Sequence, residues 1–375
     1  MRVDEKNIEY FDACVSLIAL ENCQLAQGDR VVKPIITAII PTYRRPALLR
    51  RAISSVLEQA GGAIRVCVYD NASGDETAGL VAAMAVEDHR VVYYRHPLNI
   101  GGLANFAFGL SRVDTPFFSL LSDDDYLLPG FYQRALAGLK IHPNAMCWAG
   151  MTLNVDESGR IWDARVRHWP REGVYEPPGG FIHMTGGMAP AWTGILFRRE
   201  VLDSVGMLDV DLLGPSDLEY CLRLAVKFPF VLEKHPSAVF TLNSESFSAT
   251  QPMSSFWPGW KRMLQKFDAD DNLPETFRQQ ALSALLKDAR RMLFRRGANG
   301  LAAGRIDFVR DAAEALKIDC GQATRAHLLR ILAATCKRSS VMQHAYTHAY
   351  RLAERRIVRS RGMLQEEYGH LLRTA

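Results

Sequence analysis

The chain has 375 residues, 48% of them hydrophobic and 23% charged, which is typical of a soluble globular protein with one large domain and an appendage, or with two domains. It has no apolar run of about 18 residues, so no transmembrane helix is expected, and its seven widely spaced cysteines exclude a disulfide framework and a zinc site. The net charge of +4 combines a basic region from residue 255 onward, at +10, with a remainder at −6, which indicates two units in different environments.

The N-terminal residues 1–32 are expected to form a helical extension, because their apolar patch is short and bordered by acidic residues, unlike a secretory signal. Residues 35–40 then form a continuous apolar run, which is typical of a strand buried on both faces, and a helix with apolar residues at helical spacing follows. The same pattern recurs, with strands expected at roughly 64–69, 90–95 and 116–121 and helices at about 75–86 and up to 111.

This alternation of strands and helices predicts a parallel sheet with right-handed crossovers. In such sheets, ligands bind beyond the carboxyl ends of the strands. The segments that carry Tyr43, Asp70, Asn99 and Asp125 each follow a predicted strand. We therefore expect these four segments to meet at one edge of the sheet, although they are far apart in sequence.

The remainder of the chain is less regular. Strand-like pieces occur at 145–153, 192–197 and 237–242, separated by loops rich in glycine and proline. From residue 255 onward, apolar residues at helical spacing alternate with arginines. A helical region with a basic surface is therefore expected at the C-terminal end.

Three consecutive carboxylates, Asp123, Asp124 and Asp125, stand between a buried-strand pattern and the turn at Pro129-Gly130. Like charges at the end of a buried strand repel one another and are costly to desolvate without a counter-charge. A divalent cation that also binds phosphate oxygens would supply one, since hard cations prefer carboxylate ligands. The alternative interpretation is an acidic surface turn.

Five stretches, in order, give the chain a family resemblance. They read ITAIIPTYRRPALLRRAISSVLEQ, VYDNASGDET, NIGGLANF, LLSDDDYLLPG and TGILFRREVLDSVGMLDVDLLGPSDLEYCLRLA. Over about residues 35–245 the sequence resembles the family 2 glycosyltransferases. The resemblance implies an α/β fold of GT-A type, a Rossmann-like and mostly parallel sheet flanked by helices, with a helical C-terminal appendage.

The resemblance also divides the chain. Residues 33–250 would form the glycosyltransferase domain, with a nucleotide-sugar-binding half over 33–125 and an acceptor-binding half over 126–250. Residues 251–375 would form the basic helical C-terminal region.

For the donor nucleotide, the resemblance implies that Pro41 and Thr42 bring the backbone close to the base and ribose, and that Tyr43 offers a ring on which the base stacks. Asp70 would accept a hydrogen bond from an N–H of the base. The alternatives are a packed turn aromatic for Tyr43 and a turn or helix-capping carboxylate for Asp70. Asn99 would either contact the nucleotide or fix the loop near it.

The carboxylate cluster is implied to bind Mn²⁺ or Mg²⁺ that carries the diphosphate of a UDP-, dTDP- or GDP-linked sugar. Ser122 stands where many family members have an aspartate, so which pair holds the metal stays open. We assign the metal to Asp125, with Asp123 as a ligand of the metal or of the ribose, and Asp124 to the donor site.

The base that deprotonates the acceptor is assigned to Asp217, which matches the aspartate of a family Glu-Asp pair that opens a helix. Ser216 replaces the glutamate of that pair. The alternative for Asp217 is a helix-start carboxylate that complements the helix dipole, and Glu219 is the fallback base.

On the acceptor side, Trp192 is a candidate platform for a sugar ring or simply a core residue. Family members often have a histidine late in the domain that helps to bind the metal. Here Asn243 or Glu245 would replace it, or the metal lacks that ligand, and His235 is expected in a loop before the last strand.

Taken together, these features predict a metal-dependent, inverting and non-processive glycosyltransferase that moves one sugar to a saccharide or lipid-linked saccharide, in bacterial surface polysaccharide or O-antigen assembly. Unpaired thiols predict a cytoplasmic setting. The basic region is either a solvated helical cap or a contact with the anionic inner face of the membrane. No nucleic-acid-binding module occurs, and an oligomer is compatible with the sequence.

Two rival functions differ in the residues that they require. A sugar-1-phosphate nucleotidyltransferase needs a glycine-rich loop after the first strand, and residues 41–45 contain no glycine. A catalytically degenerate GT-A protein, serving as a nucleotide-binding or scaffold subunit, remains the alternative, because Ser122, Ser216 and the missing histidine depart from the family pattern.

Overall fold

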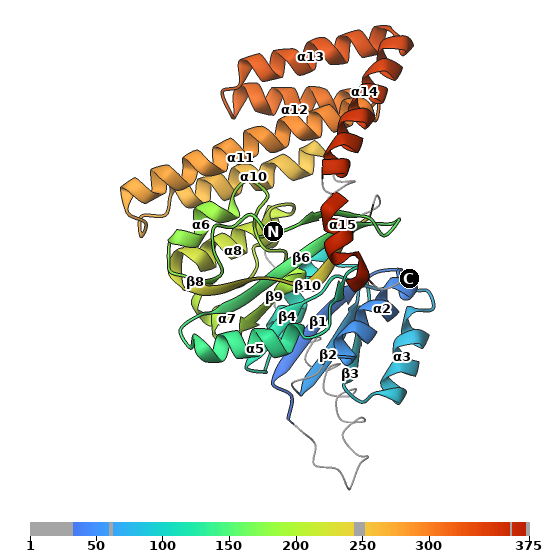
Figure 1. The fold of residues 1–375 in the computed structure, drawn as a ribbon, viewed down its shortest axis with the longest axis vertical. Coiled ribbons are helices and arrows are strands. Elements are labelled where there is room, and N and C mark those ends of the chain that lie inside the picture. The colour runs from blue at the N-terminus through green and yellow to red at the C-terminus, as the bar shows by residue number, and fades with distance from the viewer. Residues whose placement is uncertain (1–32, 60–62, 244–251, 361, 373–375) are drawn as a thin grey trace. The chain divides into compact units, whose positions relative to one another are not determined.

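A mixed sheet of ten strands forms the centre of the described chain (Figure 1). The computed structural model describes residues 33–59, 63–243, 252–360 and 362–372, and the side chains of 358–360 are not described. The helical extension expected over 1–32 lies outside these residues. Residues 34–375 form one compact unit.

The first half of the sheet is parallel, as the sequence predicts. β1 pairs with β2 on one side and with β4 on the other, and β2 pairs with β3. The bounds of these strands are Ile36–Thr42 for β1, Ile64–Asp70 for β2, Val91–Arg95 for β3 and Phe117–Leu120 for β4. Their carboxyl ends therefore lie at one edge, which brings the four polar segments together.

The second half of the sheet is mixed. β9 runs antiparallel between β4 and β6, while β10 lies parallel to β6 and antiparallel to β5 and β8. The bounds are Tyr126–Leu127 for β5, Cys147–Asp156 for β6, Ile161–Ala164 for β7, Gly173–Tyr175 for β8, Ile195–Arg198 for β9 and Phe230–Leu242 for β10.

The position expected for His235 is wrong. It lies inside β10, which begins at Phe230 and not near residue 237. The apolar residues 230–232 pair with β6 and β8, and a register shift at Pro236 follows. The polar run at 233–235 hid this first part of the strand from sequence periodicity.

Helices cover both faces of the sheet (Figure 1). In β1, Ala38 and Ile40 pack with Leu49 and other buried residues on one face, whereas Ile39 belongs to the core on the opposite face. The helices of this part are α2 Pro46–Leu57, α3 Thr77–Glu87, α4 Gly102–Ser111, α5 Phe131–Ile141, α6 Gly179–Met184, α7 Glu200–Ser204 and α8 Ser216–Lys227. Two short 3₁₀ segments are η1 Trp192–Gly194 and η2 Val210–Leu212.

The remaining helices form the appendage expected at the C-terminal end. They are α10 Met253–Asp268, α11 Glu275–Ala302, α12 Ile306–Ile318, α13 Ala323–Arg338, α14 Ser340–Ser360 and α15 Gly362–Tyr368, followed by η3 Gly369–Leu371. One hydrophobic core runs without a break from the sheet through α8 into α10 and α11, including Trp260 and Leu285. No helix within the described residues is long and apolar enough to cross a membrane.

The close approach of α10 to η2 depends on Gly259. A Cβ atom at this position would lie 1.8 Å from the backbone oxygen of Leu212, which a side-chain rearrangement cannot relieve. We expect Gly259→Ala to lower the free energy of unfolding by about 1–3 kcal/mol or more, the cost of overpacking. The matched control is Gly79→Ala in α3, where a Cβ meets nothing within 4 Å and replacing a helical glycine should stabilise by about 0.5–1 kcal/mol. Chemical denaturation of both variants measures the difference, and equal stabilities would contradict the packing.

Candidate functional site

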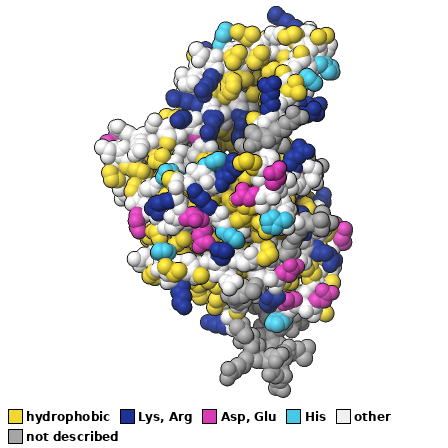
Figure 2. All heavy atoms as spheres, viewed as in Figure 1, with side chains coloured by type: hydrophobic (Ala, Val, Ile, Leu, Met, Phe, Trp, Pro, Cys, Tyr) yellow, Lys and Arg dark blue, Asp and Glu magenta, His cyan; other side chains and the backbone are white. Residues whose placement is uncertain are grey.

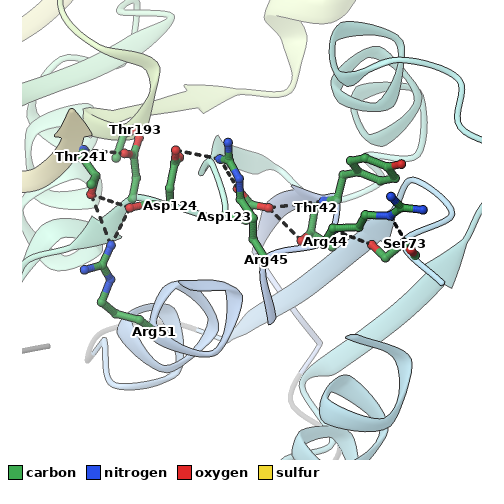
Figure 3. Close-up of polar contacts among 11 residues, drawn as sticks. Thr42, Arg44, Arg45, Arg51, Ser73, Asp123, Asp124, Thr193 and Thr241 are labelled. Atoms are coloured by element: carbon green, nitrogen blue, oxygen red, sulfur yellow. Dashed lines mark hydrogen bonds and ion pairs between the residues drawn. The ribbon is translucent and has the colours of Figure 1, made fainter. Parts of the chain in front are cut away.

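The three consecutive carboxylates follow β4 at the carboxyl edge of the sheet, and they do not converge. Asp123 and Asp124 face the loop after β1, whereas Asp125 faces the opposite way, toward η1 and β10. Figure 3 shows the Arg45 side chain reaching the carboxylates of Asp123 and Asp124. The cluster therefore divides into a pair and a separate third member.

Arg45, at the start of α2, supplies the counter-charge to the pair. Its Nη1 lies 2.8 Å from a carboxylate oxygen of Asp124 and 3.4 Å from one of Asp123. Asp123 also accepts a 2.8 Å hydrogen bond from the Thr42 hydroxyl and a 3.3 Å bond from the Tyr43 N–H. Burial, together with the charge of Asp124, raises the pKa of Asp123 to about 6, and the Thr42 and Arg45 contacts oppose that rise.

The contacts of Asp125 are those of a buried structural residue. It is 1% exposed, and its carboxylate accepts hydrogen bonds from the Thr193 hydroxyl in η1 and, at 2.8 Å, from the Thr241 N–H in β10. Burial, with the nearby charge of Asp124, raises the pKa of Asp125. Both carboxylate oxygens are thus used to join the loop after β4 to η1 and β10, which is unfavourable for the metal role assigned to Asp125 from the sequence.

Two further residues, not identified from the sequence, complete this corner. Arg51 of α2 donates a 2.6 Å hydrogen bond to the backbone oxygen of Asp124, and Thr241 donates its hydroxyl to the same oxygen (Figure 3). These contacts fix the backbone that carries the acidic pair.

The acidic pair fits a divalent cation that arrives with a diphosphate. Within the described part of the chain, no three His, Cys, Asp or Glu side chains converge on a metal position. Mg²⁺, however, is commonly held by one or two carboxylates with the remaining ligands from water and substrate phosphates. Asp123 and Asp124 supply two such carboxylates, and both contact the Arg45 guanidinium.

Tyr43 and Asp70 lie at the same edge. The Tyr43 ring is 38% exposed, with the Arg44 guanidinium 5.0 Å from its centroid. Asp70, at the end of β2, is buried, and its oxygens accept hydrogen bonds from the Ser73 N–H at 2.9 Å and the Tyr93 hydroxyl at 2.6 Å. Tyr43 is therefore accessible to a ligand, whereas Asp70 holds the turn that follows β2.

Arg44 joins the loops after β1 and β2. Its N–H and its Nε donate to the hydroxyl and the backbone oxygen of Ser73, at 2.9 and 3.0 Å (Figure 3). Pro41 and Thr42 are buried at the end of β1, in register with β2. The loop that was expected to approach the nucleotide thus has a fixed conformation.

Asn99 belongs to a hydrogen-bonded group behind that loop. Its side-chain oxygen accepts from Asn71 at 3.0 Å and from the Gly101 N–H at 2.9 Å. Asn105 donates to the Tyr69 backbone oxygen at 2.7 Å. The contacts of Asn99 and Asn105 are those of residues that fix loop geometry. Asn71, which takes part in this group, was not identified from the sequence.

Asp217 lies in the first turn of α8 and is exposed to a cavity of about 520 Å³. One carboxylate oxygen accepts a 2.7 Å hydrogen bond from the N–H of Leu218. The protein that surrounds the cavity disfavours the charged form and raises the pKa of Asp217, while the positive charge of Arg165 opposes the rise. Glu219, the fallback base, is instead fully buried and paired with Arg223 and Lys266.

The short segment η1 connects the two acidic centres. Trp192 donates its indole N–H to the backbone oxygen of Asp217 at 3.2 Å, and the adjacent Thr193 donates to Asp125. The half-buried Trp192 ring packs edge-on against Phe106 and Tyr220, so it has the contacts of a core residue. Asn243 is half-buried after β10, and Glu245 lies outside the described residues.

Comparison with known proteins identifies the family. The model of Glycosyl transferase family 2 matches residues 37–206. Residues 37–206 thus form a family 2 glycosyltransferase region. The matched range holds the acidic cluster and the loops after β1, β2 and β3, and it ends before Asp217, so the match says nothing of the candidate base.

The curated relatives of the chain are distant. The GalNAc(5)-diNAcBac-PP-undecaprenol beta-1,3-glucosyltransferase of Campylobacter jejuni is 33% identical over 98 residues, which are 26% of this chain and 32% of that one. The succinoglycan biosynthesis protein ExoW of Rhizobium meliloti is 30% identical over 120 residues, or 31% of this chain and 38% of that one. The chain thus spans about a third of the length of these relatives.

Solved structures confirm the GT-A fold. Residues 1–349 of TarS from S. aureus superpose with a TM-score of 0.57 at 15% sequence identity, covering 85% of this chain and 91% of that one. The same protein in complex with UDP-GlcNAc gives a TM-score of 0.56 at 15% identity, with 85% of this chain and 92% of that one covered. At this identity the likeness shows the fold alone.

Proposed function

We propose that this protein transfers one sugar from a nucleotide-sugar donor to an acceptor hydroxyl, with inversion at the anomeric carbon. The observation that carries the proposal is the link that η1 makes between two acidic centres: Thr193 contacts Asp125, the residue after the Asp123–Asp124 pair, and Trp192 contacts the backbone oxygen of Asp217. One centre suits a diphosphate with its cation, and the other suits a hydroxyl that must lose a proton.

In this mechanism the acceptor sits in the cavity and the carboxylate of Asp217 takes the proton of its attacking hydroxyl. The attack occurs on the face of the sugar opposite the diphosphate, which is the reason for inversion. Asp123 and Asp124 would hold Mn²⁺ or Mg²⁺, which when bound would neutralise the charge that develops on the leaving diphosphate. Arg45 contacts both carboxylates and so lies beside the position proposed for the diphosphate.

Several features support the substrates proposed. The exposed ring of Tyr43 offers a stacking surface for a base at the edge where Asp70 and Asn99 order the loops. A UDP-, dTDP- or GDP-linked donor fits this arrangement, and TarS, a structural neighbour, has been solved with UDP-GlcNAc. The names of two relatives, a glucosyltransferase of an undecaprenol-linked saccharide in Campylobacter and a succinoglycan biosynthesis protein in Rhizobium, favour a saccharide or lipid-linked saccharide acceptor in polysaccharide biosynthesis.

Calorimetric titration with UDP, GDP, dTDP and CDP, each with and without Mn²⁺, tests the donor site. We expect one nucleotide to bind tightly only with the metal, and that binding to be lost in Asp124→Ala. Turnover of the matching nucleotide-sugar then tests the transfer. If the wild type binds a nucleotide but never turns over its sugar, the protein is a scaffold rather than an enzyme, and if no nucleotide binds, the proposal fails.

The helices α13 and α14 suit contact with an anionic membrane surface. Residues 323–357 hold seven Lys and Arg against one acidic residue, Glu354. Large apolar side chains are exposed among them: Leu328, Ile331, Val341, Met342, Leu352 and Ile357. Figure 2 shows yellow and dark blue side chains at the top of the view, over these helices. Apolar residues beside clustered basic ones are the pattern of helices that lie on anionic lipid.

Liposome co-sedimentation tests this contact. Vesicles with anionic lipid should retain the protein at low salt and release it as salt rises, and neutral vesicles should retain little. Arg351→Glu with Arg355→Glu should weaken the binding. Equal retention by neutral and anionic vesicles would contradict the contact.

A further inference from the structure

The cavity that contains Asp217 is built from two parts of the chain. One wall of the cavity comes from the sheet domain and includes Arg165, which follows β7, and the loop at 186–190. The other wall comes from the C-terminal helices, with Trp260 of α10 and Arg295 of α11. The helical region is therefore part of the wall that faces the candidate base, rather than a remote cap.

Positive charge in this cavity is not fully paired. Asp288 uses both of its carboxylate oxygens, one on the Arg291 guanidinium at 3.1 Å and the other on the Gly186 N–H at 2.9 Å. Arg165 and Arg295 form no ion pair with any residue that the structure describes. The Arg165 guanidinium lies 5.1 Å from the centroid of the Phe240 ring, and its charge acts on Asp217. Two guanidinium groups from different elements, neither in an ion pair with a described residue, therefore line the cavity.

Like charges are crowded at the α11 wall. Arg295 adjoins Arg296, and burial, with the charges of Arg295 and Arg305, lowers the pKa of Arg296 to about 10. The Arg296 guanidinium lies 3.7 Å from the centroid of the Phe256 ring, a residue that also lines the cavity. Mutual repulsion of guanidinium groups is relieved when an anion binds among them.

Part of the cavity lining is apolar. Phe256 and Trp260 of α10 line the cavity together with Met184 and Met188. Phe256 and Trp260 are each 6% exposed, and the Arg296 guanidinium covers one face of Phe256, so these side chains give the cavity a small apolar patch. The planar fork of arginine matches the two oxygens of a phosphate or carboxylate. The lining thus combines a small apolar patch with a position for a negative charge.

We propose that this cavity binds the acceptor and that the acceptor carries an anionic group, a phosphate or a carboxylate, bound between Arg165 and Arg295. The proposal rests on the proposed function, because it names the substrate class of the same site. It also gives the helical region a role, which is to select acceptors by charge.

Ligand-observed NMR titration of the full chain in EDTA tests the proposal with three probes: galactose 1-phosphate, glucuronic acid and methyl galactoside. EDTA removes metal-dependent binding of phosphates at the donor site. We expect at least one anionic probe to bind and the neutral glycoside to bind at least tenfold more weakly. The two anionic probes decide between phosphate and carboxylate.

Arg165→Gln and Arg295→Gln should each weaken binding of the anionic probe by about tenfold and leave the affinity for methyl galactoside unchanged. Arg330→Gln, an exposed arginine on α13 outside the cavity, is the matched control and should bind like the wild type. Binding of the neutral glycoside equal to that of the anions, or unchanged anion binding in both cavity variants, would overturn the proposal. So would the absence of binding by either anion.

The donor experiment is independent of these titrations. Metal-dependent nucleotide binding with no anion binding in EDTA would reject the anionic acceptor and keep the glycosyltransferase. Suppose instead that the protein binds no nucleotide but binds anions through Arg165 and Arg295. That result would reject the proposed glycosyltransferase function and support the anion site.

Discussion

Replacing Asp217 by Asn is expected to lower kcat for sugar transfer by about 10²- to 10⁴-fold, the usual contribution of a positioned general base. The amide preserves the size of the side chain and can still accept the hydrogen bond from the Leu218 N–H, so α8 should stay intact. Nucleotide binding should be unchanged, because no contact of the Asp217 carboxylate reaches the Asp123–Asp124 pair. Single-turnover kinetics together with nucleotide titration separates the two effects.

The control for this variant is Asp211→Asn. Asp211 is a carboxylate in η2, and its exposed side chain lies 3.5 Å from Arg262. We expect its kcat to equal that of the wild type, because the residue does not line the cavity. If Asp217→Asn turns over at a rate near that of the wild type, the base lies elsewhere and the mechanism proposed for the acceptor side is wrong.

The pH dependence of the rate supplies a second readout for the same residue. A base works only when it is deprotonated, so activity should fall as the pH drops through the pKa of Asp217. Because the surrounding protein raises that pKa, the acidic limb of the profile should lie above the range of an ordinary aspartate. Arg165→Gln removes the charge that opposes the rise, so in that variant the limb should move to still higher pH.

The sequence allowed the parallel half of the fold to be predicted because each strand there is a continuous apolar run with a helix after it. The mixed half could not be predicted in the same way. β9 inserts between β4 and β6, and that order depends on packing across long sequence separations, which local periodicity does not encode. The first part of β10 was missed because charged residues interrupt its pattern at 233–235.

The candidate site shows the same division. The loops that bear Tyr43, Asp70 and Asn99 could be located from the sequence, but the partners of the acidic cluster could not. Thr193 and Thr241 are ordinary threonines, 68 and 116 residues away from Asp125, with no local signal. The contact of Arg45 with the acidic pair could have been predicted, because Arg45 stands in a loop expected to meet three aspartates and opposite charges attract. The cavity forms only when α10 and α11 pack on the sheet domain, so no local sequence motif predicts it.

The second large effect concerns the acidic cluster. Substitution of Asp124 should reduce metal-dependent nucleotide binding, whereas substitution of Asp125 should reduce the stability of the fold. Asp124→Asn is expected to fold normally and to lose metal-dependent nucleotide binding by about a hundredfold or more, since even an outer-shell partner of a metal ligand contributes about 10- to 100-fold to affinity. The fold should survive because the backbone oxygen of Asp124, which binds Arg51 and Thr241, is kept. Calorimetry with Mn²⁺ and the nucleotide that binds the wild type measures the loss.

Asp125→Ala should instead lower the free energy of unfolding by about 2–4 kcal/mol, because the Thr193 hydroxyl and the Thr241 N–H each lose a partner at a cost of about 1–3 kcal/mol. Asp125→Asn keeps an acceptor in place, so most of the stability and the metal-dependent binding should remain. The opposite result, in which a well-folded Asp125→Asn loses the metal while Asp124→Asn retains it, would restore the metal to Asp125. It would also require the Asp125 carboxylate to leave Thr193 of η1 and Thr241 of β10 when the metal binds, because both of its oxygens accept hydrogen bonds there.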